Sequence, residues 1–172
     1  MKILIDARLY GPKHTGNGRY TSELVNNLAK LDHANQYFIL LRKENMNISF
    51  PSNFKKILAD FKHYSFIEQF KLPYLLYKLK PNIVHFPHFN VPVLYFGKFV
   101  VTIHDMIMHK FKGGTATTKG FLGYLLFRIG YHLSFAKAVY GSEKIIVPSE
   151  FVKNEIVKFY KVNKKKILAI YE

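Results

Sequence analysis

The segment KILIDARLYGPKHTGNGRYTSELVNNLAKL, residues 2–31, contains a strand pattern, a glycine-bearing loop and a helix pattern in succession. An apolar run that ends at an acidic residue predicts a strand over residues 2–6. Leu24, Leu28 and Leu31 recur at helical spacing, which predicts a helix over residues 18–31 that packs one face on the sheet. A strand, a loop and a helix in this order are typical of a parallel α/β sheet.

The same alternation continues along the rest of the chain. Further strand patterns occur at residues 37–41, 56–59, 83–86, 99–103, 144–147 and 167–171, and further helix patterns at residues 65–79, 119–140 and 149–160. They predict a Rossmann-like, doubly wound parallel sheet between two helix layers, which is a three-layer α/β/α fold. With 172 residues, of which 49% are hydrophobic, the chain suits a single domain over residues 1–172.

Composition restricts both the chemistry and the expected location. The chain contains no cysteine, which excludes disulfides, thiolate metal sites and cysteine nucleophiles and fits a reducing, cytoplasmic compartment. The first strand reaches Asp6 after only three apolar residues, so we expect no signal peptide. The apolar stretch at residues 120–141 includes Arg128, His132 and Lys137. We therefore expect a helix packed in the core rather than a membrane span.

The charge of the chain limits the classes of partner. The formal net charge is +15, and only four of the 26 basic residues are arginines. Such a surface attracts nucleic acid, anionic lipid and phosphorylated substrates. Arginine is the usual residue for bidentate recognition of bases, so sequence-specific nucleic-acid binding is disfavoured. A solvated lysine surface that binds nothing remains an alternative.

Polar residues gather where four of the predicted strands end. The carboxyl ends of parallel strands share one edge of a sheet, and ligands bind there. The segments are Asp6-Ala7-Arg8 with the loop 11–19, His85-Phe86-Pro87-His88-Phe89-Asn90, His104-Asp105 and Pro148-Ser149-Glu150. Five of the eight histidines fall on this edge: His14, His85, His88, His104 and His109. The sequence therefore places the candidate site at this edge.

The glycine-bearing loop is suited to an anion. Gly16-Asn17-Gly18 opens the first predicted helix, where backbone N–H groups and the positive helix end can face a diphosphate. The third position after Gly18 is Thr21, so the loop is not a G-x-G-x-x-G fingerprint. A tight turn that needs glycine for conformational reasons alone is the other interpretation.

His104 and Asp105 are the strongest candidates for chemistry. A histidine beside a carboxylate can carry a proton or donate a hydrogen bond, although the pair can also simply cap the next turn. His85 and His88 together with this pair resemble no usual metal-ligand spacing, so we predict no metal site. Ser149 fits the N-cap of the last helix.

Taken in order, several segments resemble the amino-terminal domain of the retaining GT-B glycosyltransferases of family 4. They are ILIDAR (3–8), TGNGRY (15–20), PNIVHFP (81–87), VTIHDM (101–106), IVPSEF (146–151) and the end of the chain from Ile167. The resemblance implies one half of a GT-B fold, with retention of configuration and no metal cofactor. It also implies that a donor-binding domain is supplied in cis or by a second chain, since no such domain is present in these residues.

The resemblance also implies roles for individual residues. Gly16, Gly18 and Arg19 are expected near the donor diphosphate. His104 and Asp105 are expected at the transferred sugar. The acceptor is expected to meet His85, His88, Asn90 and Ser149.

The expected function is therefore that of an acceptor-binding half, inactive alone, for transfer of a mannosyl- or glucosyl-type sugar from a nucleotide sugar to a glycan or lipid-linked acceptor. A non-catalytic domain that binds phosphorylated sugar, nucleotide or nucleic acid is the first alternative, and a metal-dependent hydrolase is the second. The basic aromatic segments at residues 61–64 and 70–74 either seat the domain peripherally on anionic lipid at the inner face of the cell membrane or pack in the core.

Overall fold

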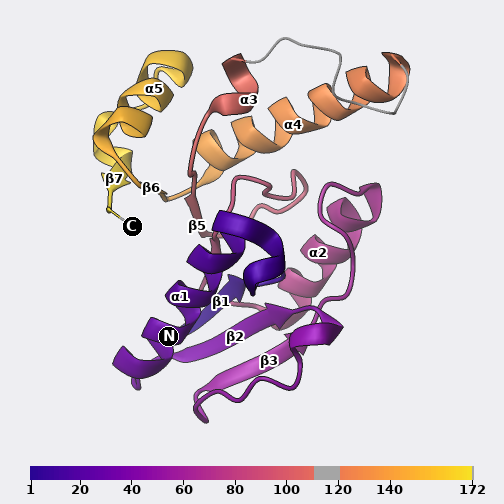
Figure 1. The fold of residues 1–172 in the computed structure, drawn as a ribbon, viewed down its shortest axis with the longest axis vertical. Coiled ribbons are helices and arrows are strands. Elements are labelled where there is room, and N and C mark those ends of the chain that lie inside the picture. The colour runs from indigo at the N-terminus through magenta and orange to yellow at the C-terminus, as the bar shows by residue number, and fades with distance from the viewer. Residues whose placement is uncertain (111–120, 172) are drawn as a thin grey trace.

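The computed structural model describes residues 1–110 and 121–171, whose elements are labelled in Figure 1. The strands are β1 (Lys2–Asp6), β2 (Gln36–Leu41), β3 (Phe54–Leu58), β4 (Ile83–Phe86), β5 (Phe99–Thr102), β6 (Lys144–Val147) and β7 (Ile167–Ala169). The α-helices are α1 (Thr15–Leu31), α2 (Phe66–Leu79), α3 (Ile107–Lys110), α4 (Phe121–Gly141) and α5 (Glu150–Tyr160). The short 3-10 helices are η1 (Pro12–His14), η2 (Lys43–Asn45) and η4 (Lys164–Lys166).

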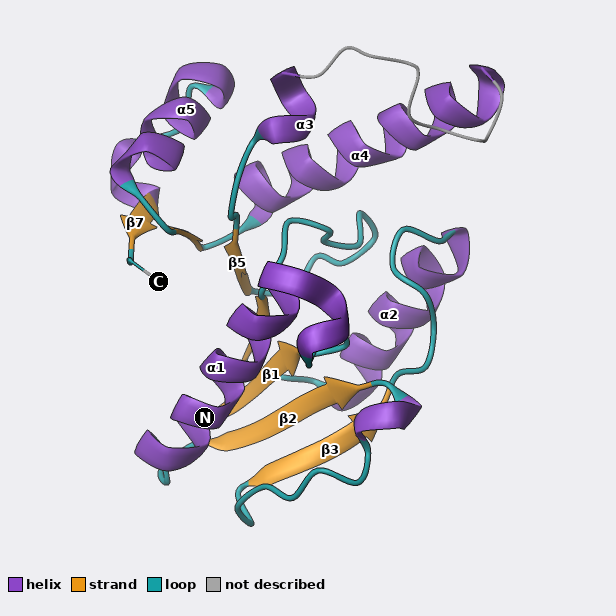
Figure 2. Ribbon diagram, in the orientation of Figure 1, coloured by secondary structure: helices purple, strands orange, loops and turns teal. Residues whose placement is uncertain are grey.

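The strands form one sheet in the order β3-β2-β1-β4-β5-β6-β7, and every pairing is parallel. In the register, Ile5 of β1 lies between Ile39 of β2 and His85 of β4. The strand order reverses between β1 and β4, which makes this pair the topological switch point of a doubly wound sheet. Figure 2 shows the helices packed around the strands.

Alternation along the strands produces a core on each side of the sheet. Neighbouring strand residues point to opposite faces, so Ile5 packs with Val25 and Ala29 of α1, whereas Leu4 belongs to the cluster that contains Leu72 of α2. Buried residues of α4 and α5 join that second, larger cluster. The three-layer α/β/α fold predicted from the sequence is confirmed.

Several predicted boundaries need correction. The first helix begins at Thr15, so Gly16, Asn17 and Gly18 form its first turn and are not a loop before it. Leu31 is 81% exposed and does not pack on the sheet, whereas Leu24 and Leu28 pack against the core cluster that contains Val25 and Ala29. The predicted strand at residues 167–171 ends at Ala169, and residues 119 and 120 of the helix predicted over residues 119–140 lie outside the described residues.

The start of α1 is held close to the chain that precedes it. Gly18 is buried, and a Cβ at this position would collide with the carbonyl oxygen of Gly11 and approach that of Leu9 within 2.9 Å. Thr15 has φ 53° and ψ −138°, a conformation that costs a non-glycine residue about 1–3 kcal/mol. The first turn of α1, where the sequence predicted an anion site, is therefore packed tightly against the preceding chain.

Two helices leave large apolar side chains in solvent. On α4, Tyr131 and Phe135 are buried, but Leu126 and Leu133 are about half exposed, so the expectation of a helix packed in the core holds for one side only. On α2, Phe70 is 65% exposed, which contradicts core packing for that aromatic. In the described part of the chain, no helix is long and apolar enough to cross a bilayer.

A matched pair of glycine substitutions tests the close approach between the first turn of α1 and the preceding chain. Gly18→Ala should lower the free energy of unfolding by about 1–3 kcal/mol, because the added methyl group meets backbone that cannot easily move. Gly16→Ala has nothing within 4 Å of its new Cβ and should leave stability unchanged or raise it by up to ~1 kcal/mol. Urea denaturation measures both values, and equal effects of the two substitutions would contradict the close approach at Gly18.

Candidate functional site

A buried ion network occupies the switch point, where β1 ends. Arg8 donates from Nε to Asp6 Oδ1 at 2.7 Å and from Nη2 to Asp6 Oδ2 at 2.6 Å. The same Nη2 donates to Glu68 Oε1 on α2 at 2.7 Å. Arg8 and Glu68 are both fully buried, and the ring of Phe61 lies 4.7 Å from the guanidinium carbon. One cation thus joins the end of β1 to the start of α2.

Glu68 completes its contacts through the N-terminal turn of α2. Ser65 is the N-cap, and its hydroxyl accepts a hydrogen bond from the Glu68 N–H at 3.2 Å. Glu68 Oε2 accepts from the Tyr64 N–H at 2.7 Å and from Asn90 Nδ2 at 2.9 Å. Glu68 was not among the predicted site residues, although the S-x-x-E spacing of Ser65 and Glu68 is a capping-box signal that locates the carboxylate beside the helix start.

Burial and charge act in opposite directions on the two carboxylates. Burial raises the pKa of Asp6, but the bidentate Arg8 guanidinium outweighs burial and holds that pKa below its usual value. Burial also raises the pKa of Glu68, and Arg8 and Asn90 oppose this increase only in part. Asp6 is therefore the firmly ionised partner of Arg8, and Glu68 is held more by hydrogen bonds.

A second chain of hydrogen bonds links β4, β5 and α1. His85 Nε2 lies 2.9 Å from the Thr102 hydroxyl, which lies 3.0 Å from the Tyr20 hydroxyl. Burial lowers the pKa of His85 to about 4, and nearby His104 adds to the decrease, so the ring is neutral at pH 7. His85 was predicted to meet the acceptor; it is buried on β4 and contacts Thr102.

His104 is positioned from two sides. Its Nε2 lies 3.0 Å from the carbonyl oxygen of Pro87, which can only accept, so Nε2 carries the proton and donates. The ring meets the Tyr20 ring edge-on, with centroids 4.7 Å apart. Tyr20 lies one turn after Gly16 on α1. His104 and the first turn of α1 are thereby held together at the same edge of the sheet.

Asp105 has a structural contact as well as an exposed carboxylate. Its Oδ1 accepts a hydrogen bond from the Ile107 N–H at 2.9 Å, which is the capping role that the sequence analysis offered as an alternative. The side chain is exposed, and a carboxylate with one oxygen in a cap still has the other to offer a ligand.

The loop after β4 supplies the remaining polar groups of the edge. His88 lies 3.4 Å from the Tyr64 hydroxyl, and its Nδ1 accepts from the Asn90 N–H at 3.3 Å. Burial lowers the pKa of His88 to about 4. Asn90 is buried and lines a small cavity together with Asp6 and His63. The structure therefore joins two predicted acceptor residues, His88 and Asn90, to the buried ion network.

The first turn of α1 fits the predicted diphosphate site in its backbone. Amides in the first turn of an α-helix have no partner within the helix and face outward along its axis. Gly16 and Asn17 occupy this turn, and Arg19 follows on the exposed surface. Gly18 is buried and shapes the turn, so its contribution to an anion site is indirect.

Two predicted residues lie apart from this group. Ser149 is the N-cap of α5, where its hydroxyl accepts from the Val152 N–H at 3.3 Å, which confirms the capping prediction. His109 is held between the Tyr160 hydroxyl at 2.6 Å and the Tyr131 hydroxyl at 2.7 Å. His109 therefore belongs to an aromatic cluster of α3, α4 and α5.

Three of the predicted histidines have oxygen atoms of the protein as partners. Among the residues that the structure describes, no three side chains of the metal-binding types are grouped so as to hold an ion. His85 contacts a threonine hydroxyl, His104 a backbone carbonyl, and His109 two tyrosine hydroxyls.

The buried histidine on β4 should make stability depend on pH. The folded protein keeps His85 neutral down to about pH 4, whereas the unfolded chain protonates near 6.5. The contribution of neutral His85 to the free energy of unfolding is fully present above pH 6.5. It is lost as the pH falls toward 4, and the loss is up to roughly 3 kcal/mol. Chemical denaturation of His85→Gln at pH 7 and pH 4.5 should show a smaller loss than the wild type. His33→Gln, an exposed control, should keep the wild-type loss; an unchanged loss in His85→Gln would contradict the assignment.

Comparison with known proteins identifies the family. The sequence model described as Glycosyltransferase Family 4 matches residues 15–172. A search of the curated proteins found no match. The matched region includes the first turn of α1, the His104 edge and the last strand. The chain therefore belongs to Glycosyltransferase Family 4 and has the fold of an N-terminal-type domain of that family.

Proposed function

We propose that this chain is the acceptor-binding domain of a retaining GT-B glycosyltransferase. It works with a donor-binding domain, supplied in cis or by a second chain, to transfer a mannosyl- or glucosyl-type sugar from a nucleotide sugar to a glycan or lipid-linked acceptor. The transfer belongs to polysaccharide biosynthesis and needs no metal ion. The domain functions in the cytoplasm, peripherally at the inner face of the membrane.

One observation carries the proposal: Tyr20 ties His104 to the N-terminal turn of α1. The Tyr20 ring packs on His104, and its hydroxyl contacts Thr102 at the end of β5. A ligand with an anionic group at Gly16 and a neutral, hydroxyl-bearing group at His104 would bridge these two parts of the edge. A nucleotide sugar has its diphosphate directly beside its sugar, and this order matches the two parts of the edge.

The residues then divide the work. The first-turn amides at Gly16 and the Arg19 cation stabilise the diphosphate, as a helix N-terminus does for other anions. His104 and Asp105 contact the sugar that is transferred. His88 and Asn90 receive the acceptor, with Ser149 at the periphery, and His85 positions Thr102 and Tyr20 without touching substrate.

Domain closure supplies the rest of the mechanism. Two domains that close on a nucleotide sugar expel water, which favours transfer over hydrolysis. The network of Arg8, Asp6 and Glu68 is already closed to solvent and holds the acceptor side rigid before the donor arrives. Such rigidity keeps the reacting groups aligned.

Activity of the assembled enzyme tests the proposal. With the natural donor-binding partner co-expressed, UDP-glucose or GDP-mannose should support sugar transfer to an acceptor in a host extract. His104→Ala should lower kcat by about 100-fold with little change in the acceptor KM, because a contact to developing charge is lost. His33 lies before β2, at the opposite edge of the sheet. The matched control His33→Ala should therefore leave kcat unchanged.

Two outcomes would contradict the proposal. The 172-residue chain alone should show negligible transfer, and robust turnover by it would refute the division into two halves. Titration of the chain with nucleotide sugars and with a DNA oligonucleotide distinguishes the proposed transferase domain from a non-catalytic domain that binds nucleic acid. Tight, salt-sensitive binding of the oligonucleotide and none of the nucleotide sugars would favour a nucleic-acid-binding domain.

A further inference from the structure

An apolar groove runs between α2 and α4 beside the proposed acceptor end of the site. Its volume is about 470 Å³, within the range of small-molecule sites. One wall comes from α2 and the other from α4, and the loop after β4 forms the floor. The apolar lining includes Phe66, Phe70, Leu94, Leu126, Phe127 and Leu133.

The side chains of the groove are exposed to a degree that core packing does not explain. Phe66 is 80% exposed and Phe70 65%, while Leu126 and Leu133 are each just over half exposed. Single exposed apolar residues are ordinary, but a contiguous set that lines a groove marks an interaction site. An apolar ligand between the two helices would cover all four.

The groove is polar at the end that meets the candidate site. Asn90 lines both the groove and the small cavity that contains Asp6 and His88. Tyr64 lines the groove and contacts His88 through its hydroxyl group. A molecule with an apolar tail and a polar head would therefore place its head among Asn90, Tyr64 and His88 and its tail between the helices.

The charge beside the groove favours an anionic head. The one acidic residue of α2 is Glu68, which is buried against Arg8. The described part of α4 has no acidic residue and contains Arg128 and Lys137, and α2 exposes Lys71 and Lys78. None of the described residues that line the groove is charged. The cations lie on the surrounding surface of the two helices, whose described residues include no exposed carboxylate, and attract an anionic ligand from there.

We infer that the groove binds the hydrocarbon chain of an anionic, lipid-type acceptor, whose head is thereby delivered to His88 and Asn90. This inference rests on the proposed function, because it takes the ligand to be the acceptor of the proposed sugar transfer. It selects the lipid-linked class of acceptor over free glycans. The lining is apolar, the far end is polar, and the surrounding charge is positive. These three properties together match an amphiphile with a phosphate head.

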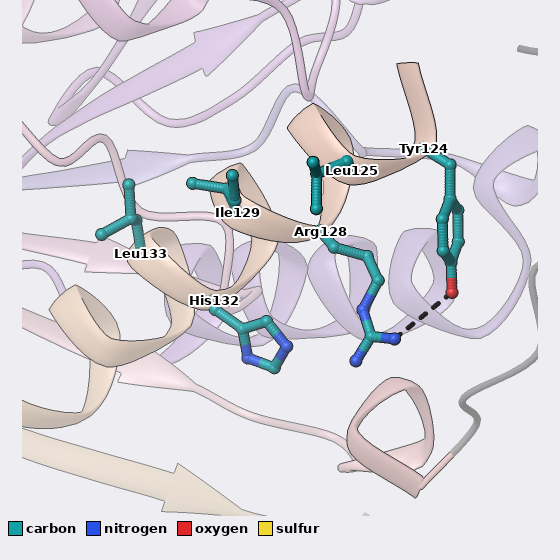
Figure 3. Close-up of a pocket in the computed structure, with 6 residues that line it drawn as sticks. All are labelled: Tyr124, Leu125, Arg128, Ile129, His132 and Leu133. Carbon is teal, nitrogen blue, oxygen red and sulfur yellow. Dashed lines mark hydrogen bonds between the residues drawn. The ribbon is translucent and has the colours of Figure 1, made fainter. Parts of the chain in front are cut away.

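A neighbouring hollow on α4 provides the contrast (Figure 3). It is lined by Tyr124, Leu125, Arg128, Ile129, His132 and Leu133, all from this one helix. Arg128 Nη1 donates to the Tyr124 hydroxyl at 3.4 Å. No second element forms an opposite wall among the lining residues, and the hollow does not reach the candidate site. It therefore serves as a control surface.

Calorimetric titration with monomeric alkyl phosphates tests the groove directly. Decyl phosphate, kept below its micelle concentration, should bind at least 10-fold more tightly than hexyl phosphate, because each buried methylene adds to affinity. Inorganic phosphate should bind at least 100-fold more weakly than decyl phosphate. Decyl maltoside, with the same chain and a neutral head, should bind at least 5-fold more weakly.

Two matched pairs of variants locate the binding. Leu126→Gln should weaken decyl phosphate binding about 10-fold, whereas Leu125→Gln, one residue away at similar exposure, lines only the control hollow and should change it less than 2-fold. Phe70→Ser should act like Leu126→Gln. Phe151→Ser, with 67% exposure on α5, should act like Leu125→Gln.

Three results would overturn the inference. The first is equal weakening by Leu125→Gln and Leu126→Gln, which means general adsorption to α4. The second is binding without dependence on chain length. The third is a concentration-dependent dimer in sedimentation that Leu126→Gln abolishes, which makes a second copy the occupant. The titration needs no sugar transfer, so alkyl phosphate binding by a chain whose assembled enzyme is inactive would refute the proposed function and leave the groove assignment intact.

Discussion

The buried contact of Arg8 with Asp6 and Glu68 is the constraint on which the rest of the site depends. An ion group without solvent is tolerable only if each charge has partners, and loss of one partner typically costs 3–5 kcal/mol. Arg8 follows β1, and Glu68 lies in the first turn of α2. The chain therefore cannot move the start of α2 away from the end of β1 without exposing an unpaired charge to the protein interior.

This constraint carries over to the neighbouring loop. Glu68 also accepts from Asn90 and from the backbone of Tyr64, so one carboxylate positions both residues. Tyr64 and Asn90 in turn lie where the polar edge of the sheet meets the α2–α4 groove. The ion contacts of the switch point thus position the residues at which the polar head of the inferred ligand would meet its apolar tail.

The two sides of the switch point are built by different means. On the α1 side, close packing at Gly18 and the ring contact of Tyr20 with His104 hold a helix N-terminus beside β5. On the α2 side, charge and hydrogen bonds do the same work. The apolar side chains of α2 and α4 that line the groove are not covered by the core. They are the surface that the inferred ligand would cover.

The sequence alone predicted a doubly wound parallel sheet and the edge that collects Asp6, His85, His88 and His104, because strand and helix periodicity are local and parallel strands end on one side. The order of the strands came from the tertiary structure. Tertiary structure decided which of these residues touch. The pairing of Arg8 with Glu68 joins positions 60 residues apart, and the contact of Tyr20 with His104 joins α1 to the segment that follows β5. It also moved His109 into an aromatic cluster and left Phe70 in solvent. Such outcomes depend on how helices pack over the sheet, a property of the assembled chain that no local pattern contains.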